Sequence, residues 1–304
     1  MNKNRGLNTA AKLIGYDGST LSRIFRGVYE GSIAEVVDSI EKFKLLQEER
    51  ATVNRPPYQE TELYRTVEEC ANAARTYQKF GFIYGESQIG KTESLLHYAS
   101  RDQYNHGLTK IVEMPVGGSL SSFIPALCDA CRVSGKFRTG EAFGAIAGKL
   151  DSRMLLVVDE CARAVPGTRA DKTLDFIRAL YDAKRFGVLL VGTNIFRDQM
   201  AKDKFEPFLR QLNRRVLFRR QLSDMPSRKD LNMFAAYYRL GPAEDEAYRL
   251  QRQVVSMTGL GVWLTTLSAA NRKAQKEGKR MTWEHVIKAH AYFKRLEEKT
   301  EPEN

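Results

Sequence analysis

One short stretch, residues 80–94, constrains this chain of 304 residues more than any other. It holds the pattern G-x-x-x-x-G-K-T between an apolar, β-type run and a run that permits a helix. In that order, strand, glycine-rich loop and helix turn backbone N–H groups toward a polyphosphate at the helix amino terminus. A glycine-rich turn without a ligand is the alternative. The predicted nucleotide-binding residues are Gly85, Glu86, Ser87, Gln88, Ile89, Gly90, Lys91, Thr92 and Glu93.

Within this loop, we expect Lys91 to reach the outer phosphates and the Thr92 hydroxyl to hold Mg²⁺. A second pattern supports this expectation, because residues 154–158 form a continuous apolar run that ends in Asp159 and Glu160. Such a run is typical of a strand buried on both faces of a parallel sheet, and ligands bind at the carboxyl ends of such strands. Asp159 is the candidate for the metal, and Glu160 for orienting a water. A strand that simply ends in an acidic turn is the alternative.

A further buried strand is predicted at residues 187–191, and Gly192, Thr193 and Asn194 follow it. A polar side chain at this tip can bond the attacking water or the outermost phosphate. Asn194 is the first candidate and Thr193 the second, although an Asn at this position also suits the cap of the next helix.

Arginines recur between residues 205 and 220. One interpretation is an arginine finger that reaches the nucleotide of a neighbouring subunit, and the other is a solvated basic surface. The arginines are Arg210, Arg214, Arg215, Arg219 and Arg220.

The amino-terminal residues 7–27 predict two short helices around a tight turn, with Ser19 or Thr20 capping the second helix. Leu21, Ile24 and Phe25 are expected to face inward. Small polar residues and arginines on the outer face suit the major groove of DNA, whereas a plain helical hairpin with a basic surface is the alternative. A longer amphipathic helix, residues 32–48, is expected to close this core. The candidate DNA-binding residues are Ser19, Thr20, Ser22, Arg23 and Arg26.

Composition sets the broader frame. A net charge of +11 and a pI near 9.4 indicate a polyanionic partner such as nucleic acid, although solubility also accounts for a basic surface. Without a long apolar run or a signal core, we expect a cytoplasmic protein without membrane contact. Breaks in the pattern, above all Pro56-Pro57, divide the chain into a helix-turn-helix unit (1–54), an α/β core (55–223) and a helical lid (224–304).

Together, the loop at 85–92, the Asp159-Glu160 strand, the Asn194 strand and the nearby arginines resemble the Walker A, Walker B, sensor 1 and arginine-finger elements of AAA+ ATPases. Nearly the whole chain resembles the phage Mu B-like family of transposition ATPases and, more distantly, the IstB-type helpers. The resemblance implies an α/β AAA+ fold with a parallel sheet, ATP and Mg²⁺ as cofactors, and assembly of homo-oligomers as filaments or rings on double-stranded DNA. It also implies a transposase of the DDE integrase type as partner, Arg214 as the finger and Arg210 as second choice.

The chain departs from the pattern where AAA+ lids commonly carry a sensor arginine, because residues 259–267 offer Trp263 and Leu264 instead. The leading hypothesis is a DNA-stimulated ATPase that recruits a transposase to its target. A helicase loader or replication-initiator ATPase is the second hypothesis, and a regulator that binds ATP without hydrolysing it is the third.

Overall fold

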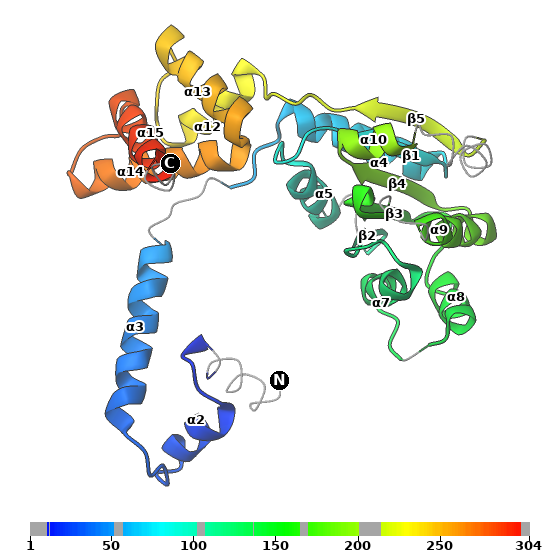
Figure 1. Ribbon diagram of the computed structural model, residues 1–304, viewed down its shortest axis with the longest axis horizontal. Coiled ribbons are helices and arrows are strands. Elements are labelled where there is room, and N and C mark those ends of the chain that lie inside the picture. The colour runs from blue at the N-terminus through cyan, green and yellow to red at the C-terminus, as the bar shows by residue number, and fades with distance from the viewer. Residues whose placement is uncertain are drawn as a thin grey trace, which may run out of the picture. The chain divides into compact units, whose positions relative to one another are not determined.

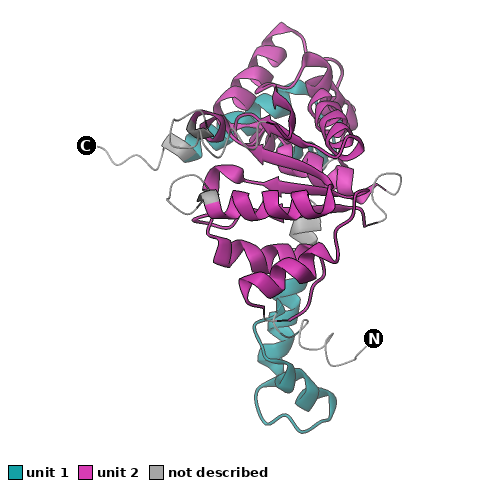
Figure 2. Ribbon diagram, turned by 90° about the vertical axis from the view of Figure 1, so that its right-hand side faces the viewer, with its two compact units in different colours: residues 1–55, 268–304 teal, residues 56–267 magenta. Residues whose placement is uncertain are grey.

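The computed structural model describes residue 11 and residues 13–51, 57–101, 107–135, 137–164, 170–200 and 214–298. The chain separates into two compact units, Pro56–Leu267 and a second unit made of residues 1–55 and 268–304 (Figure 2). The predicted limit between core and lid at residue 223 falls inside the larger unit. The three-part division therefore stays a prediction.

The larger unit is built on a five-stranded parallel sheet with the strand order β2-β3-β4-β1-β5 (Figure 1). The predicted α/β fold with a parallel sheet is thereby confirmed. The strands are β1 (Phe80–Tyr84), β2 (Thr109–Glu113), β3 (Leu155–Asp159), β4 (Gly187–Gly192) and β5 (Val216–Gln221).

Helices cover both faces of this sheet, and others follow it in the chain. In the described part, none has the length and apolarity that crossing a membrane requires. The helices are α4 (Glu62–Thr76), α5 (Lys91–Ser100), α7 (Leu120–Ala130), α8 (Thr139–Ala147), the 3₁₀ turn η1 (Cys161–Ala164), α9 (Ala170–Lys184), α10 (Asn194–Met200), α12 (Arg228–Tyr237), α13 (Asp245–Thr258), α14 (Leu260–Lys276) and α15 (Trp283–Glu298).

The central strands β3 and β4 explain the continuous apolar runs in the sequence. Leu155 and Val157 of β3 pack with α4 and α5 on one face, whereas Leu156 and Val158 pack with α7, α8 and α9 on the other. Every residue of both strands is buried. Because β3, β4 and β1 are parallel neighbours, the segments that follow them come together at one edge of the sheet.

Strand β5 was not predicted, because the sequence pattern in that stretch indicates only recurring arginines. It pairs with β1 at the edge of the sheet, and its Phe218 ring covers Gly81, where an added Cβ would lie 2.3 Å from Phe218. Arg219 and Arg220 of β5 are exposed. An edge strand tolerates charged side chains, so it lacks the apolar run that identified β3 and β4.

The smaller unit contains α2 (Gly18–Phe25) and α3 (Ile33–Ala51), which share a small core of Ala11, Leu21 and Val36. The predicted cap was wrong. Asp17 caps α2 by accepting from the backbone N–H groups of Ser19 and Thr20, because its carboxylate precedes both hydroxyls in the chain. Phe25 was expected inside this core but is 76% exposed.

The close packing of β4 against α4 generates a stability prediction. A Cβ at Gly187 would lie 2.6 Å from the Ala74 carbonyl oxygen and 2.6 Å from Arg75 Cα, so Gly187→Ala must displace backbone. We expect the free energy of unfolding to fall by about 1–3 kcal/mol in chemical denaturation. Gly140→Ala is the control, because an added Cβ there meets nothing within 4 Å. Equal stability of the two variants would contradict this packing.

Candidate nucleotide site

The loop between β1 and α5 wraps around the side chain of Lys91. Its ammonium is buried and donates to the carbonyl oxygens of Gly85 at 2.9 Å and Glu86 at 2.5 Å. Burial lowers the pKa of Lys91, against the opposing effect of nearby carboxylates, Asp159 first. Gly90 makes the turn into α5 with φ +102°, a conformation that suits glycine. The loop therefore holds the Lys91 ammonium against its own backbone, next to the amino terminus of α5.

The side chains of Thr92 and Asp159, the two predicted metal ligands, meet directly. The Thr92 hydroxyl donates to Asp159 Oδ2 at 2.6 Å, and Asp159 Oδ1 accepts from the Glu160 N–H at 2.8 Å. Asp159 is only 3% exposed. A hydroxyl and a carboxylate are oxygen donors of the kind that Mg²⁺ takes beside substrate phosphates. The residues present therefore fit the ion.

Glu160 follows Asp159 in a left-handed backbone conformation, with φ +56°. Non-glycine residues rarely adopt this conformation, and such strained positions cluster at functional sites. Its carboxylate lies 3.9 Å from Arg163 Nε, and Arg163 Nη1 bonds Glu113 at 2.5 Å. Glu160 thus stands at the carboxyl edge of the sheet, beside Asp159.

Asn194 reaches the phosphate loop from the end of β4. Its Nδ2 donates to Glu86 Oε1 at 2.6 Å. Asn194 Oδ1 and Thr193 Oγ1 are buried and have no hydrogen-bond partner among the described residues. Buried polar atoms nearly always have partners, so these two positions suit a bound water or a phosphate oxygen.

The described residue that was the first candidate for the arginine finger, Arg214, does not join this cluster. Arg214 is exposed and directly precedes β5, whose first residue pairs with Phe80 at the start of β1. The phosphate loop follows the other end of β1, about 17 Å away along a strand of this length. Arg215 instead pairs with Asp182 at 2.8 Å. Arg210 lies outside the described residues.

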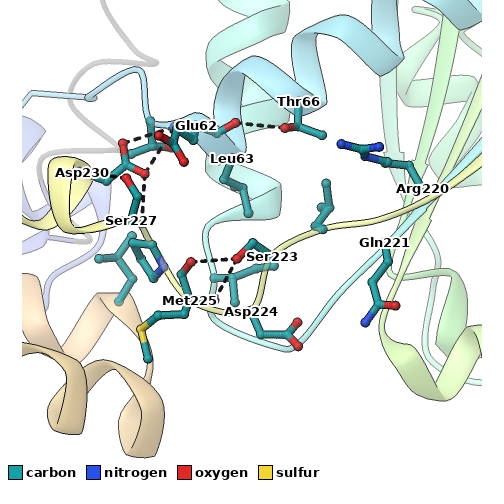
Figure 3. A pocket seen from close by; sticks show the side chains of 15 residues that line it. Glu62, Leu63, Thr66, Arg220, Gln221, Ser223, Asp224, Met225, Ser227 and Asp230 are labelled. Carbon is teal, nitrogen blue, oxygen red and sulfur yellow. Dashed lines mark hydrogen bonds between the residues drawn. The ribbon is translucent and has the colours of Figure 1, made fainter.

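A cavity of about 610 Å³ adjoins the loop, and the sequence patterns had not indicated it (Figure 3). Its wall comes from the start of α4, the loop residue Ile89, the connection from β5 to α12, and the start of α14. Because β5 was missed, the connection that follows it could not be placed beside the loop. The apolar lining suits a flat ring, and it consists of Leu63, Ile89, Leu222, Met225, Pro226 and Leu260.

The connection after β5 and the start of α14 also touch the loop through hydrogen bonds. The Glu86 N–H donates to Asp224 Oδ1 at 3.1 Å, and the Leu260 N–H donates to the Gln88 carbonyl at 3.2 Å. Gly259 permits this approach, since an added Cβ would lie 2.7 Å from Gln88 Cβ. Trp263, which stands where a sensor arginine is common, is fully buried. The connection after β5 therefore contacts the loop through the Asp224 carboxylate, and the start of α14 contacts it through its backbone.

The candidate DNA-binding residues lie on α2 and just beyond it, in the smaller unit. Arg23 and Arg26 are exposed, whereas Thr20 and Ser22 are half-buried. The Ser19 hydroxyl is engaged by Asp17. The two arginines are therefore the groups of this set best able to reach phosphates.

Comparison with known proteins agrees with this geometry. Residues 74–200 match the family described as AAA domain. No curated protein sequence matches the chain. Among solved structures, the chain resembles the Aeropyrum pernix Orc1 protein in complex with DNA at 17% identity and a TM-score of 0.52, over 79% of this chain and 67% of that chain.

Two weaker likenesses have a TM-score of 0.47 each. Domain III of the Thermotoga maritima replication initiation protein DnaA matches at 16% identity over 78% of this chain and 93% of that chain. Thermotoga maritima RuvB T158V matches at 15% identity over 76% of this chain and 68% of that chain. The matched residues 74–200 hold the loop, the Asp159-Glu160 pair and Asn194 on a parallel sheet, and this stretch is similar to the AAA domain family.

Proposed function

We propose that this protein is an ATP-hydrolysing, DNA-binding ATPase that assembles into oligomers on duplex DNA. The observation that carries the proposal is the contact between Thr92 and Asp159 at 2.6 Å beside the buried Lys91. It joins a phosphate-binding loop to an acidic strand end in one site, the arrangement that phosphoryl transfer from a nucleotide requires.

Each residue of the site has a defined role in this proposal. The apolar side of the cavity takes the base, Lys91 binds the outer phosphates, and Thr92 and Asp159 hold Mg²⁺. When bound, Mg²⁺ neutralises charge on the phosphate oxygens. Glu160 orients a water and accepts its proton, while the open hydrogen-bond positions of Asn194 and Thr193 hold that water or a phosphate oxygen.

Charge and position support the proposals of DNA binding and self-association. Arg23 and Arg26 are exposed on a short helical unit of a chain with a net charge of +11. The Orc1 structure that shares this fold is a complex with DNA. Arg214 precedes β5 and lies at the end of the sheet away from its own loop. In this proposal it is therefore the arginine finger for the site of a neighbouring copy, with Arg210 as second choice.

The partner proposal is a transposase of the DDE integrase type, which this ATPase directs to its DNA target. It rests on the resemblance of the motif order to the Mu B-like family. A replication initiator or helicase loader is the second candidate, favoured by the shared fold with Orc1. A pull-down that recovers a replicative helicase and no integrase-type protein decides for this second candidate.

Lys91→Ala tests whether nucleotide binding drives assembly. With duplex DNA and a slowly hydrolysed ATP analogue, we expect wild-type filaments or rings in electron microscopy and none with the variant, because the phosphates lose their cation. ATP turnover should be lost as well. Lys149→Ala, which changes an exposed lysine, is the control. Normal assembly by Lys91→Ala, or strictly monomeric wild-type particles, would refute the proposal.

Glu160→Gln separates hydrolysis from binding. The amide keeps the shape of the side chain but accepts no proton, so ATP turnover should fall about 10²- to 10⁴-fold. The affinity for a fluorescent ATP analogue should stay unchanged, and Glu246→Gln, an exposed position, should behave as wild type. Unchanged turnover in Glu160→Gln would instead favour a regulator that only binds ATP.

Salt dependence tests the DNA interface. If about six to ten basic side chains contact phosphates, affinity for duplex DNA should fall about 10³- to 10⁵-fold between 50 and 200 mM salt. Arg23→Ala and Arg26→Ala should each reduce the slope of log affinity against log salt by about 1, measured by fluorescence anisotropy. Arg153→Ala, an exposed arginine of the larger unit, is the control. A flat salt response would show that the charge serves solubility alone.

A further inference from the structure

The segment that leads into α4 is fastened to α5 at two points. The Tyr58 ring stacks on His97 with ring centres 4.1 Å apart, and Tyr64 packs edge-on against both rings. Glu60 Oε1 accepts from Arg101 Nη1 at 2.7 Å and lies 3.4 Å from His97 Nε2. The position of Tyr58 is therefore fixed by its neighbours on both sides.

The residues of α5 that contact this segment lie on the same helix as the predicted phosphate-binding residues. Ser94 and His97 are three positions apart, and Arg101 follows four positions later, so all three lie on one side of the helix axis. Lys91 and Thr92 open the same helix. Contacts that fix this side of α5 therefore also fix the end of the loop that leads into it.

A chain of hydrogen bonds runs from the segment into the loop. The Tyr58 hydroxyl donates to Ser94 Oγ at 2.8 Å, and Ser94 Oγ donates to the Gly90 carbonyl at 2.9 Å. Ser94 is only 1% exposed. Burial raises the pKa of Tyr58 to about 12, so its hydroxyl keeps the proton at neutral pH and remains a donor.

The last hydrogen bond of this series, to the Gly90 carbonyl, affects phosphate binding through the geometry of the peptide group. The Gly90 carbonyl and the Lys91 N–H belong to one planar peptide group. Fixing the oxygen therefore fixes the direction of an N–H at the amino terminus of α5, where a phosphate binds. The Ser94 N–H also donates to the Gly90 carbonyl at 3.0 Å, so Ser94 holds this oxygen with both its backbone and its side chain, and Tyr58 orients the side chain.

We infer that Tyr58 is a positioning residue of the nucleotide site, which acts through Ser94 on the Gly90–Lys91 peptide. This inference rests on the proposed ATPase function. It assigns the segment before α4 a part in the alignment of the phosphate loop, in addition to its packing.

The test uses Tyr58→Phe, Ser94→Ala and the double variant in the full-length chain. Phe keeps the ring stack and loses only the hydroxyl. Loss of one hydrogen bond should raise the Kd for a fluorescent ATP analogue and the KM for ATP about three- to tenfold. We expect kcat to stay within about twofold, because Asp159 and Glu160 are untouched. The double variant should bind no more weakly than Ser94→Ala, since both changes break the same chain. Tyr77→Phe, 65% exposed, is the matched control.

The possible outcomes separate this inference from the function on which it rests. If the wild-type protein binds no nucleotide, the proposed function fails and the inference fails with it. If the wild type binds and Tyr58→Phe matches Tyr77→Phe, only the inference fails. A fall in kcat with unchanged KM, or effects of Tyr58→Phe and Ser94→Ala that simply add, would overturn the inference, because Tyr58 would then not act on phosphate binding through Ser94.

Discussion

The burial of β3 and β4 between two helical layers is the constraint on which the site depends. Both strands are buried along their whole length, so they admit polar side chains only where they end. Asp159 closes β3, Thr193 and Asn194 follow β4, and the phosphate loop follows β1, the next strand in the sheet. The contact between Thr92 and Asp159, 67 positions apart in the chain, is therefore a product of sheet order. Parallel pairing brings the three chain segments to one edge and fixes which side chains can meet there.

The phosphate loop itself is mostly backbone, and its shape is held from outside. Asp224 binds the Glu86 N–H, the Leu260 N–H binds the Gln88 carbonyl, and Ser94 binds the Gly90 carbonyl. Gln88 adopts φ +62°, a conformation that a free loop of L-residues seldom keeps. Donors that are aligned before the substrate arrives need no reorganisation when charge develops. The contacts from α5, from the connection after β5 and from the start of α14 thus all hold the backbone of this loop.

The sequence predicted those parts of the site whose signal is local. The spacing of Gly85, Gly90 and Lys91 encodes a turn into a helix, and the run before Asp159 encodes a doubly buried strand, so both lie where they were expected. Strand β5 was missed because an edge strand with Arg219 and Arg220 carries no such run. Without this strand, the sequence also could not place Asp224 and Met225 at the site, because they reach it only by following β5. The contact between Leu260 and Gln88 uses backbone atoms of distant segments, and backbone contacts of this kind leave no side-chain pattern to detect.

The electrostatics of the site bear on the proposed assembly. Carboxylates of Asp159, Glu160, Glu86 and Asp224 all lie close enough to Lys91 to oppose the lowering of its pKa by burial. In the proposed reaction ATP adds several negative charges to this acidic setting, and Mg²⁺ with Lys91 offsets only part of them. Charge that develops in the transition state is best met by a further cation placed at the outer phosphate. In the proposed assembly Arg214 of a neighbouring copy supplies this cation, because Arg214 precedes β5 at the end of the sheet away from its own loop. The proposed assembly on DNA would then be a condition of rapid hydrolysis, because it brings that cation to the site.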